Sequence, residues 1–280
     1  MKIEPPKAEK IPFKHEIHGD VRIDNYYWLN ERDNDKVIDY LNNENSYTDK
    51  ILKPTQKLQD ELFQEMKSRI KEDDTSVPYY YNDYWYMRKY EKGKDYPVYL
   101  RKYKSLDADE ELLVDVNELA KGYSYFQLRG ISISPDNKKM AYAVDTLSRR
   151  IYTIKIKNLE TGEMYNEQIK NTTGGSTWAN DNKTLFYSSR EDVTLRVNKI
   201  HKHKLGSDTS MDELVYEEKD KEFSTGVYKT KSNKFLVIGS GSTLTSEVRY
   251  VDADDPNKEP KLFLKRVEGH EYSIEHYKND

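Results

Sequence analysis

One pattern recurs three times along this 280-residue chain: a strand-like segment, a polar turn that ends in Asn-Lys, and a second strand-like segment. The Asn-Lys pairs start at Asn137, Asn182 and Asn233, which are 45 and 51 residues apart. A further strand-like segment and a turn-rich stretch follow each copy. Repeats of this length with about four strands are typical of β-propeller blades, the small sheets that surround a propeller axis. The repeat therefore favours a propeller over a β sandwich, the other common arrangement of many short strands.

The strand pattern begins near residue 76, and the residues before it have a helical pattern. We therefore expect an N-terminal extended and helical leader at 1–75 and an incomplete β propeller at 76–280. The expected blades cover approximately 78–125, 126–172, 173–222 and 223–268, and a fifth starts at 269–280. The predicted fold class is mostly β, with an N-terminal helical segment and about four blades of a propeller.

Two segments of the leader carry apolar residues at helical spacing. The first segment is 34–52, and the second is 55–70. In the second segment a four-residue step places four apolar side chains on one helix face: Leu58, Leu62, Met66 and Ile70. Two helices with so few other apolar residues cannot form a core alone, so we expect them to pack on a further partner.

Composition argues against several classes of function. Charged residues make up 34% of the chain, a share that would permit disorder, but 24 Tyr, 7 Phe and 3 Trp are more than disordered chains usually carry. The net charge of −4 and the lack of a long basic run argue against a nucleic-acid partner. No apolar run is long enough to span a bilayer, and the first ten residues do not resemble a signal peptide. We expect no membrane partner and a cytoplasmic protein, or a periplasmic one if a signal was removed.

No catalytic constellation is recognisable in the chain, so we assign no catalytic residue. The Gly-x-Ser-x-Gly motif of a serine hydrolase is absent, since Gly239-Ser240-Gly241-Ser242 fails its spacing and is interpreted as a loop that closes a strand. Gly174-Gly175-Ser176 is interpreted as a turn between blades. His201 and His203 share a strand face but lack a third metal ligand, so exposed histidines on a lysine-rich strand are the simpler interpretation. Cysteine is absent, and we expect neither a metal nor a cofactor.

The leader contains a more specific signal. Residues 18–29, His-Gly-Asp-Val-Arg-Ile-Asp-Asn-Tyr-Tyr-Trp-Leu, resemble the opening signature of the prolyl oligopeptidase family, and of its oligopeptidase B branch in particular. Further segments resemble that branch in the same order along the chain: 40–47, 147–150, 158–162, 178–181, 216–220 and 270–273. The resemblance therefore covers essentially the whole chain.

The resemblance implies a larger serine peptidase. Members of this family have a helical leader, a seven-bladed propeller and a C-terminal α/β-hydrolase domain that carries the Ser, Asp and His triad. This chain would supply the leader, about four of the seven blades and the start of a fifth, and the absent hydrolase domain would be the packing partner of the leader helices. The parent would hydrolyse short peptides after Arg or Lys, with the propeller limiting substrate size. We expect the chain alone to be inactive.

Four residues are candidates for a substrate-gating or interdomain role. Arg149 and Arg150 match a propeller segment of the family, and we interpret them as a pair that contacts carboxylates such as Asp73 or Asp74. A plain pair of surface arginines is the alternative interpretation. For the chain as a whole, the alternative function is a non-catalytic propeller that binds a partner protein.

Overall fold

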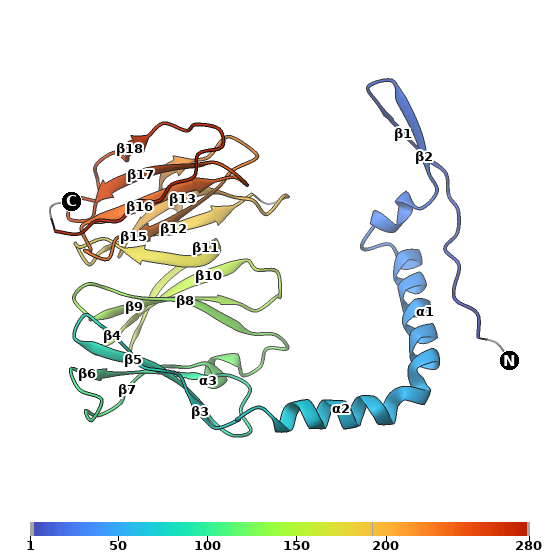
Figure 1. Cartoon of the computed structure of the whole chain (residues 1–280), viewed down its shortest axis with the longest axis horizontal. Helices are drawn as coiled ribbons and strands as arrows, with labels where there is room; N and C mark the ends of the chain where they lie inside the picture. Colours follow the sequence, from blue (N-terminus) through green and yellow to red (C-terminus); the bar gives the residue numbers. More distant parts are fainter. Residues whose placement is uncertain (1–2, 192, 279–280) are drawn as a thin grey trace. The chain divides into compact units, whose positions relative to one another are not determined.

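The computed structural model describes residues 3–191 and 193–278, and the chain separates into two compact units between Lys71 and Glu72. The first unit, called the leader from here on, contains a hairpin of β1 (Phe13–Ile17) and β2 (Asp20–Asp24), a short helix η1 (Tyr27–Asn30), α1 (Asp35–Leu52), η2 (Lys53–Thr55) and α2 (Gln56–Ser68) (Figure 1). The two helices predicted from the apolar spacing are confirmed. The hairpin was not predicted.

Local chemistry explains where the elements of the leader begin. The side chain of Asn34 accepts a hydrogen bond of 3.0 Å from the backbone N–H of Lys36, which caps the start of α1. His18 and Gly19 have φ values of 53° and 79°, the left-handed backbone that a two-residue hairpin turn requires. Trp28 and Val37 are the buried apolar side chains among the described residues of this unit. The leader therefore has almost no core of its own.

The second unit, residues 72–280, contains antiparallel sheets of five, seven and four strands, and the seven-stranded one divides within β11 into a second and a third sheet, which gives four in succession (Figure 1). In the first sheet, β3 (Asp74–Thr75) and β4 (Tyr79–Tyr81) pair with β5 (Tyr84–Tyr90), which is followed by β6 (Val98–Tyr103), β7 (Glu111–Asp115) and the helix α3 (Val116–Ala120). The second sheet contains β8 (Gln127–Ile133), β9 (Lys139–Asp145), β10 (Tyr152–Asn158) and the first half of β11 (Met164–Trp178).

The third sheet contains the second half of β11, β12 (Thr184–Arg190), β13 (Val197–Lys204) and β14 (Glu213–Glu217), with the short helix η3 (Thr209–Met211) before β14. The fourth contains β15 (Ser224–Lys229), β16 (Phe235–Gly241), β17 (Ser246–Asp252) and β18 (Lys261–Leu264). Four such sheets in sequence form a mostly β, partial propeller with an N-terminal helical segment, as the sequence predicts.

The strand β11 belongs to two sheets. Its first half pairs with β10, from Met164 beside Lys157 to Thr172 beside Tyr152, and its second half pairs with β12. The register shifts between Thr172 and Ser176. The expected turn at Gly174-Gly175-Ser176 was therefore wrong, because these residues lie within a continuous strand that passes from the outer edge of one sheet to the inner edge of the next.

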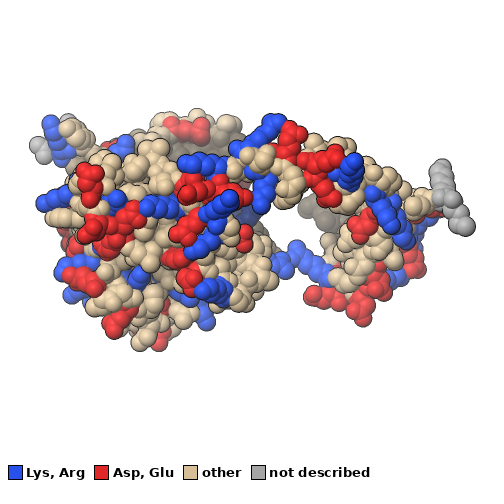
Figure 2. Space-filling view, turned by 90° about the horizontal axis from the view of Figure 1, so that it is seen from below, with Lys and Arg blue, Asp and Glu red and all other residues tan. Residues whose placement is uncertain are grey.

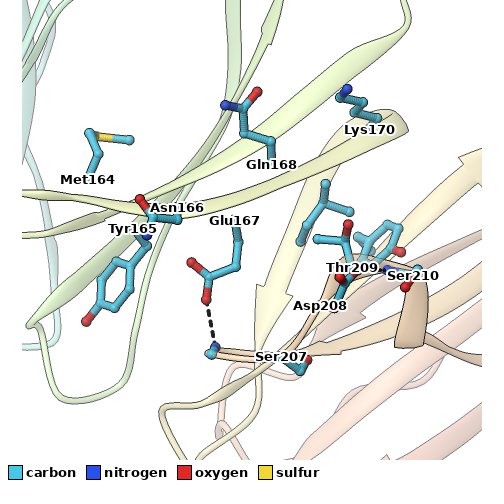
Figure 3. Close-up of a pocket in the computed structure, with 13 residues that line it drawn as sticks. Met164, Tyr165, Asn166, Glu167, Gln168, Lys170, Ser207, Asp208, Thr209 and Ser210 are labelled. Carbon is cyan, nitrogen blue, oxygen red and sulfur yellow. Dashed lines mark hydrogen bonds between the residues drawn. The ribbon is translucent and has the colours of Figure 1, made fainter.

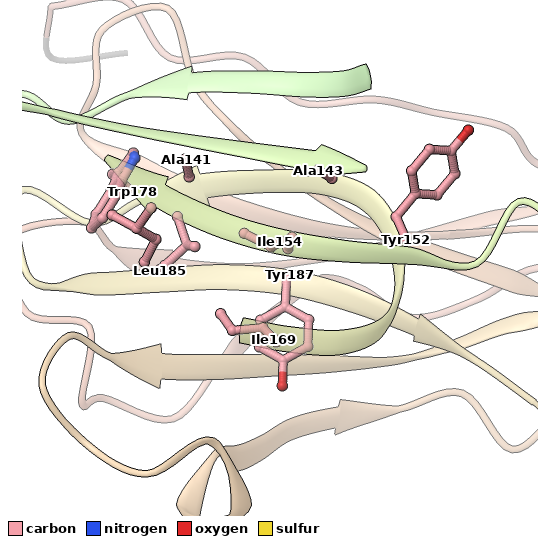
Figure 4. Close-up of a cluster of buried hydrophobic side chains, with 9 residues drawn as sticks. Ala141, Ala143, Tyr152, Ile154, Ile169, Trp178, Leu185 and Tyr187 are labelled. Carbon is pink, nitrogen blue, oxygen red and sulfur yellow. The ribbon is translucent and has the colours of Figure 1, made fainter. Parts of the chain in front are cut away.

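The apolar core lies between the sheets and follows from the two-residue period of the strands. In β9, Met140, Tyr142 and Val144 pack toward the first sheet, whereas Ala141 and Ala143 pack in the cluster shared with the third sheet. Figure 4 shows the cluster that contains Ala141 and Ala143, with side chains from β9, β10, β11 and β12. A third cluster joins Phe186 of the third sheet to the fourth sheet. Since both faces of β9 are buried, its residues from Met140 to Val144 are all apolar.

Candidate functional site

At one end of the second unit, a turn that contains an asparagine connects two consecutive strands of each sheet. These turns also contact one another between neighbouring sheets. Asn82, Asn137, Asn182 and Asn233 all have positive φ values, between 48° and 62°. Asn82 and Asn137 exchange hydrogen bonds: the Asn82 amide donates to Oδ1 of Asn137 at 2.9 Å, and the Asn137 amide donates to the backbone oxygen of Asn82 at 3.1 Å. The side chain of Asn182 accepts from the backbone N–H of Asp136 at 2.8 Å. The repeated asparagine therefore shapes its own turn and links it to the next sheet.

The strands nearest these turns line a cavity of about 200 Å³. It is lined by side chains from all four sheets, which include Tyr81, Tyr86, Trp178 and Lys229. Burial raises the pKa of Tyr86 to about 12 and lowers the pKa of Lys229 to about 8. The Lys229 ammonium donates to Oδ1 of Asn180 at 2.6 Å. The lining of the cavity is thus largely aromatic, and its lysine amine loses a proton more readily than an ordinary lysine.

The four predicted site residues lie on two separate sheets. Arg149 and Arg150 are exposed in the loop between β9 and β10, where the backbone N–H of Arg150 donates to Asp145 at 2.7 Å. Asp73 precedes β3, and Asp74 begins it. In the described ranges, neither guanidinium of the arginine pair makes a hydrogen bond or an ion pair, so the structure does not bring the arginines and these aspartates together.

The histidine pair of β13 differs from its expected environment. His203 is fully buried, not exposed, and its Nδ1 lies 2.7 Å from a carboxylate oxygen of Asp212. The other carboxylate oxygen of Asp212 accepts a hydrogen bond of 2.8 Å from the Tyr187 hydroxyl. His201 stacks on Tyr187 at a ring distance of 5.4 Å. Sequence reasoning missed this network because Asp212 lies in a loop whose approach to β13 depends on the tertiary fold.

The described residues do not complete a hydrolytic centre. The Ser189 hydroxyl lies 3.0 Å from Nε2 of His201, but no carboxylate is hydrogen-bonded to that ring in the described ranges. Burial lowers the pKa of His201, which weakens it as a base. The loop expected at Gly239-Ser240-Gly241 was wrong, because these residues are the last three of the paired strand β16. Among residues 3–191 and 193–278, no cluster of three or more His, Cys, Asp or Glu side chains could hold a metal ion.

A larger groove of about 1050 Å³ lies on the outer side of the second and third sheets. One side is the edge of β11 at residues 164–170, and the other is the loop 206–210. Figure 3 shows Glu167 pointing toward this loop, where its carboxylate accepts a hydrogen bond of 2.7 Å from the backbone N–H of Gly206. Gln168 and Lys170 project from the other face of the strand, and both also line the groove.

The surface charge is mixed. Figure 2 shows lysine and arginine side chains interspersed with aspartate and glutamate over the face in view, without a continuous basic surface of the kind that binds nucleic acid. In the part of the chain that the structure describes, no helix has both the length and the apolar composition needed to cross a bilayer.

Comparison with known proteins identifies the class. Residues 5–280 match the family model of the prolyl oligopeptidase N-terminal β-propeller domain. The chain is 39% identical to dipeptidyl aminopeptidase BI of Pseudoxanthomonas mexicana over 90% of its length, and 36% identical to Protease 2 of Moraxella lacunata over 98%. It spans only 37% and 41% of the lengths of these two proteins. The chain therefore belongs to the prolyl oligopeptidase family, within its N-terminal propeller portion.

Solved structures place the chain beside one branch of that family. Oligopeptidase B from Leishmania major superimposes with a TM-score of 0.90 at 30% identity, over 98% of this chain and 41% of that one. Oligopeptidase B from Trypanosoma brucei, in a closed form with covalently bound antipain, gives 0.89 at 27% identity, over 99% of this chain and 42% of that one. The resemblance to oligopeptidase B that the leader motif indicates is confirmed.

Proposed function

We propose that this chain is the leader and part of the propeller of an oligopeptidase B-like serine peptidase that hydrolyses short peptides after Arg or Lys. The observation that carries the proposal is the match to oligopeptidase B over both units of the chain. The propeller would limit substrate size, because a ring of rigid sheets admits only short or unfolded chains. The peptidase chemistry would belong to a hydrolase domain that these 280 residues do not contain.

The leader supports the proposal through its exposed apolar face. Leu58, Leu62, Met66 and Ile70 are between 46% and 68% exposed, and Phe63 beside them is 57% exposed. Leu58, Leu62 and Met66 lie along α2, and Ile70 follows just after its end. A run of exposed apolar side chains of this kind is costly in water and is typical of a surface that packs on another domain. We propose that the hydrolase domain of the whole protein covers this face.

The experiment is a peptidase assay on the protein encoded by the complete gene and, in parallel, on these 280 residues. A blocked fluorogenic substrate with arginine at the cleavage site should be turned over by the complete protein and not by the chain alone. A serine-directed inhibitor should abolish the turnover. Equal turnover of blocked substrates that end in arginine and in leucine would remove the proposed specificity.

A second candidate is removal of dipeptides from free N-termini, which is favoured by the 39% identity to a protein named dipeptidyl aminopeptidase BI. The same assay separates the two candidates, since an enzyme that needs a free N-terminus rejects a blocked substrate. A non-catalytic propeller that binds a partner protein is the remaining alternative. It would be supported if the complete protein cleaves neither substrate.

Arg149 and Arg150 keep their proposed role in gating or in contact between domains. Their guanidinium groups are exposed and make no ion pair in the described ranges, so both are available to a carboxylate outside these residues. Arg149→Ala in the complete enzyme should change kcat/KM, whereas Arg88→Ala, on an exposed position of β5, should not. Unchanged kinetics in both variants would leave Arg149 as a plain surface residue.

The cytoplasmic location likewise stays a prediction, which cell fractionation tests.

A further inference from the structure

The groove beside β11 has the geometry of a strand-binding site. Over residues 164–170 the strand pairs only with β10, because pairing with β12 begins at Thr172. Its second edge in this stretch faces the loop 206–210 across the groove. An unpaired strand edge presents backbone donors and acceptors that an added extended segment can satisfy.

The free edge of β11 is longer than the outermost strands of the other sheets. β7 and β14 have five residues each, and β18 has four. Proteins usually protect such edges with short strands, proline or inward-pointing charges. The stretch from Met164 to Lys170 contains no proline, and Lys170, its one lysine, lines the groove only at the end of this stretch. The edge is therefore open to a partner strand on the groove side.

The charges of the groove indicate what kind of segment fits. Glu167 points into the groove, and Asp208 lies on the opposite wall. The pKa of Asp208 is held below its usual range by hydrogen bonds from Ser210, so this carboxylate is ionised at neutral pH. In a strand added to β11, alternate side chains would face the side on which Glu167 lies. A lysine or arginine at such a position would lie between two carboxylates.

A second copy of this chain fits the groove poorly. Antiparallel pairing of the 164–170 edge with itself, centred on the groove, would place Glu167 opposite Glu167, and like charges directly opposite are destabilising. The loop 206–210 also bounds the groove on the side opposite β11.

We propose that the groove between β11 and the loop 206–210 binds an extended basic peptide segment as an added β strand. This site lies on the outer side of the sheets, and it is separate from the cavity lined by Tyr81, Trp178 and Lys229. The proposal goes beyond the peptidase function and does not depend on it. The occupant is an extended stretch with lysine or arginine at alternate positions, joined by backbone hydrogen bonds to β11.

Fluorescence anisotropy of a labelled, end-blocked hexapeptide, Thr-Lys-Val-Lys-Val-Thr, tests the proposal on the complete 280-residue chain. We expect saturable binding, and much weaker binding of the same peptide with glutamate in place of lysine. Glu167→Gln keeps an oxygen that accepts the Gly206 N–H but removes the charge, and it should weaken binding about tenfold, the value of one charge-assisted hydrogen bond. Glu163→Gln is the matched control, since Glu163 is exposed next to β11 but does not line the groove.

Backbone pairing is tested with two N-methylated versions of the peptide, each methylated at alternate residues. A strand pairs along one edge only, so one version should lose binding and the other should keep it. Retained binding of both versions, or no binding of the parent peptide up to about 1 mM, would overturn the proposal. If sedimentation shows a dimer that Glu167→Gln strengthens, a second copy of the chain is the occupant, and this result would also overturn the proposal.

Discussion

At the scale of single residues, two glycines allow β8 and β11 to approach each other. Gly130 has a φ of +65°, and a β carbon built on it would lie 1.7 Å from the carbonyl oxygen of Gly174. A β carbon built on Gly174 would in turn lie 3.0 Å from Cγ of the Tyr152 ring. No side chain can replace hydrogen at Gly130 without moving the backbone of one of these strands. The contact between the second and third sheets therefore depends on this one residue type.

The first prediction follows from that contact. Gly130→Ala should destabilise the second unit by about 3 kcal/mol or more, since strain at positive φ and steric overlap with backbone add together. Gly162→Ala is the control, because Gly162 also has a positive φ of +78° but has open space around its α carbon. Gly162→Ala should lower the free energy of unfolding by only about 1 kcal/mol. Urea unfolding monitored by tryptophan fluorescence measures both, and equal costs would contradict the steric explanation.

Lys229 gives the second prediction, which concerns pH. Its pKa is about 8 in the folded chain, below the ordinary lysine value of 10.5 that applies when the chain is unfolded, so between these values the unfolded chain binds more protons. Stability must then rise with pH in this window. From about pH 7.5 to pH 9.5 the gain from Lys229 should be on the order of 1 kcal/mol, reduced from the full shift because the side chain is partly exposed.

Lys229→Met should flatten this rise, measured as the urea midpoint at each pH. Lys231→Met, at an exposed position two residues on, should leave the rise unchanged. Equal pH profiles for the wild type and Lys229→Met would show that the amine is already neutral or fully solvated across the window.

At the scale of elements, β11 decides how two sheets are connected. The Thr172 hydroxyl, which is fully buried, donates to the backbone oxygen of Tyr152 at 3.0 Å. The oxygen of that hydroxyl also accepts from the backbone N–H of Gly174 at 3.2 Å, inside the register shift. One side chain thus satisfies two backbone groups at the point where β11 leaves the second sheet and enters the third.

The third prediction tests this connection. Thr172→Val keeps the shape and the β branch but leaves both backbone groups without their partner, and it should cost about 1–2 kcal/mol. Thr153→Val on β10 is the control, because that side chain makes no hydrogen bond in the described ranges. Its effect should stay within about 0.5 kcal/mol. The free energies of unfolding from urea titrations provide the comparison.

At the scale of the whole molecule, the two units differ in how they are stabilised. The second unit has apolar clusters between each pair of neighbouring sheets. The leader has Trp28 and Val37 as its buried apolar residues among those described, and α2 has none. The second unit should therefore resist unfolding by itself, whereas the leader depends on whatever covers its apolar face.

Limited proteolysis gives the fourth prediction. Trypsin should cleave first at Arg69 or Lys71, where the chain is irregular between α2 and β3, and should leave a stable fragment that starts at Ile70 or Glu72. Mass spectrometry of a time course identifies the fragment. Early cleavage spread through β8 to β18 would contradict a separate second unit. The domain boundary expected at residues 75 and 76 stays a prediction that the same experiment tests.

The sequence by itself determined the features that depend on near neighbours in the chain. The apolar spacing of 34–52 and 55–70 predicted both helices, and the Asn-Lys repeat predicted the propeller, because hydrophobic period and turn chemistry are local. The motif at residues 18–29 indicated the family, which the comparisons confirm.

Tertiary structure alone decided the features that depend on how loops fold back and how strands pack together. His203 was expected to be exposed and is buried, because Asp212, which also accepts a hydrogen bond from Tyr187, reaches it only in the folded sheet. Gly174 was expected in a turn and lies in a strand, because Gly130 and Tyr152 pack against it. The groove beside β11 likewise exists only where the loop 206–210 lies opposite the strand. Burial and strand pairing are set by these non-local contacts, so no local pattern could reveal them.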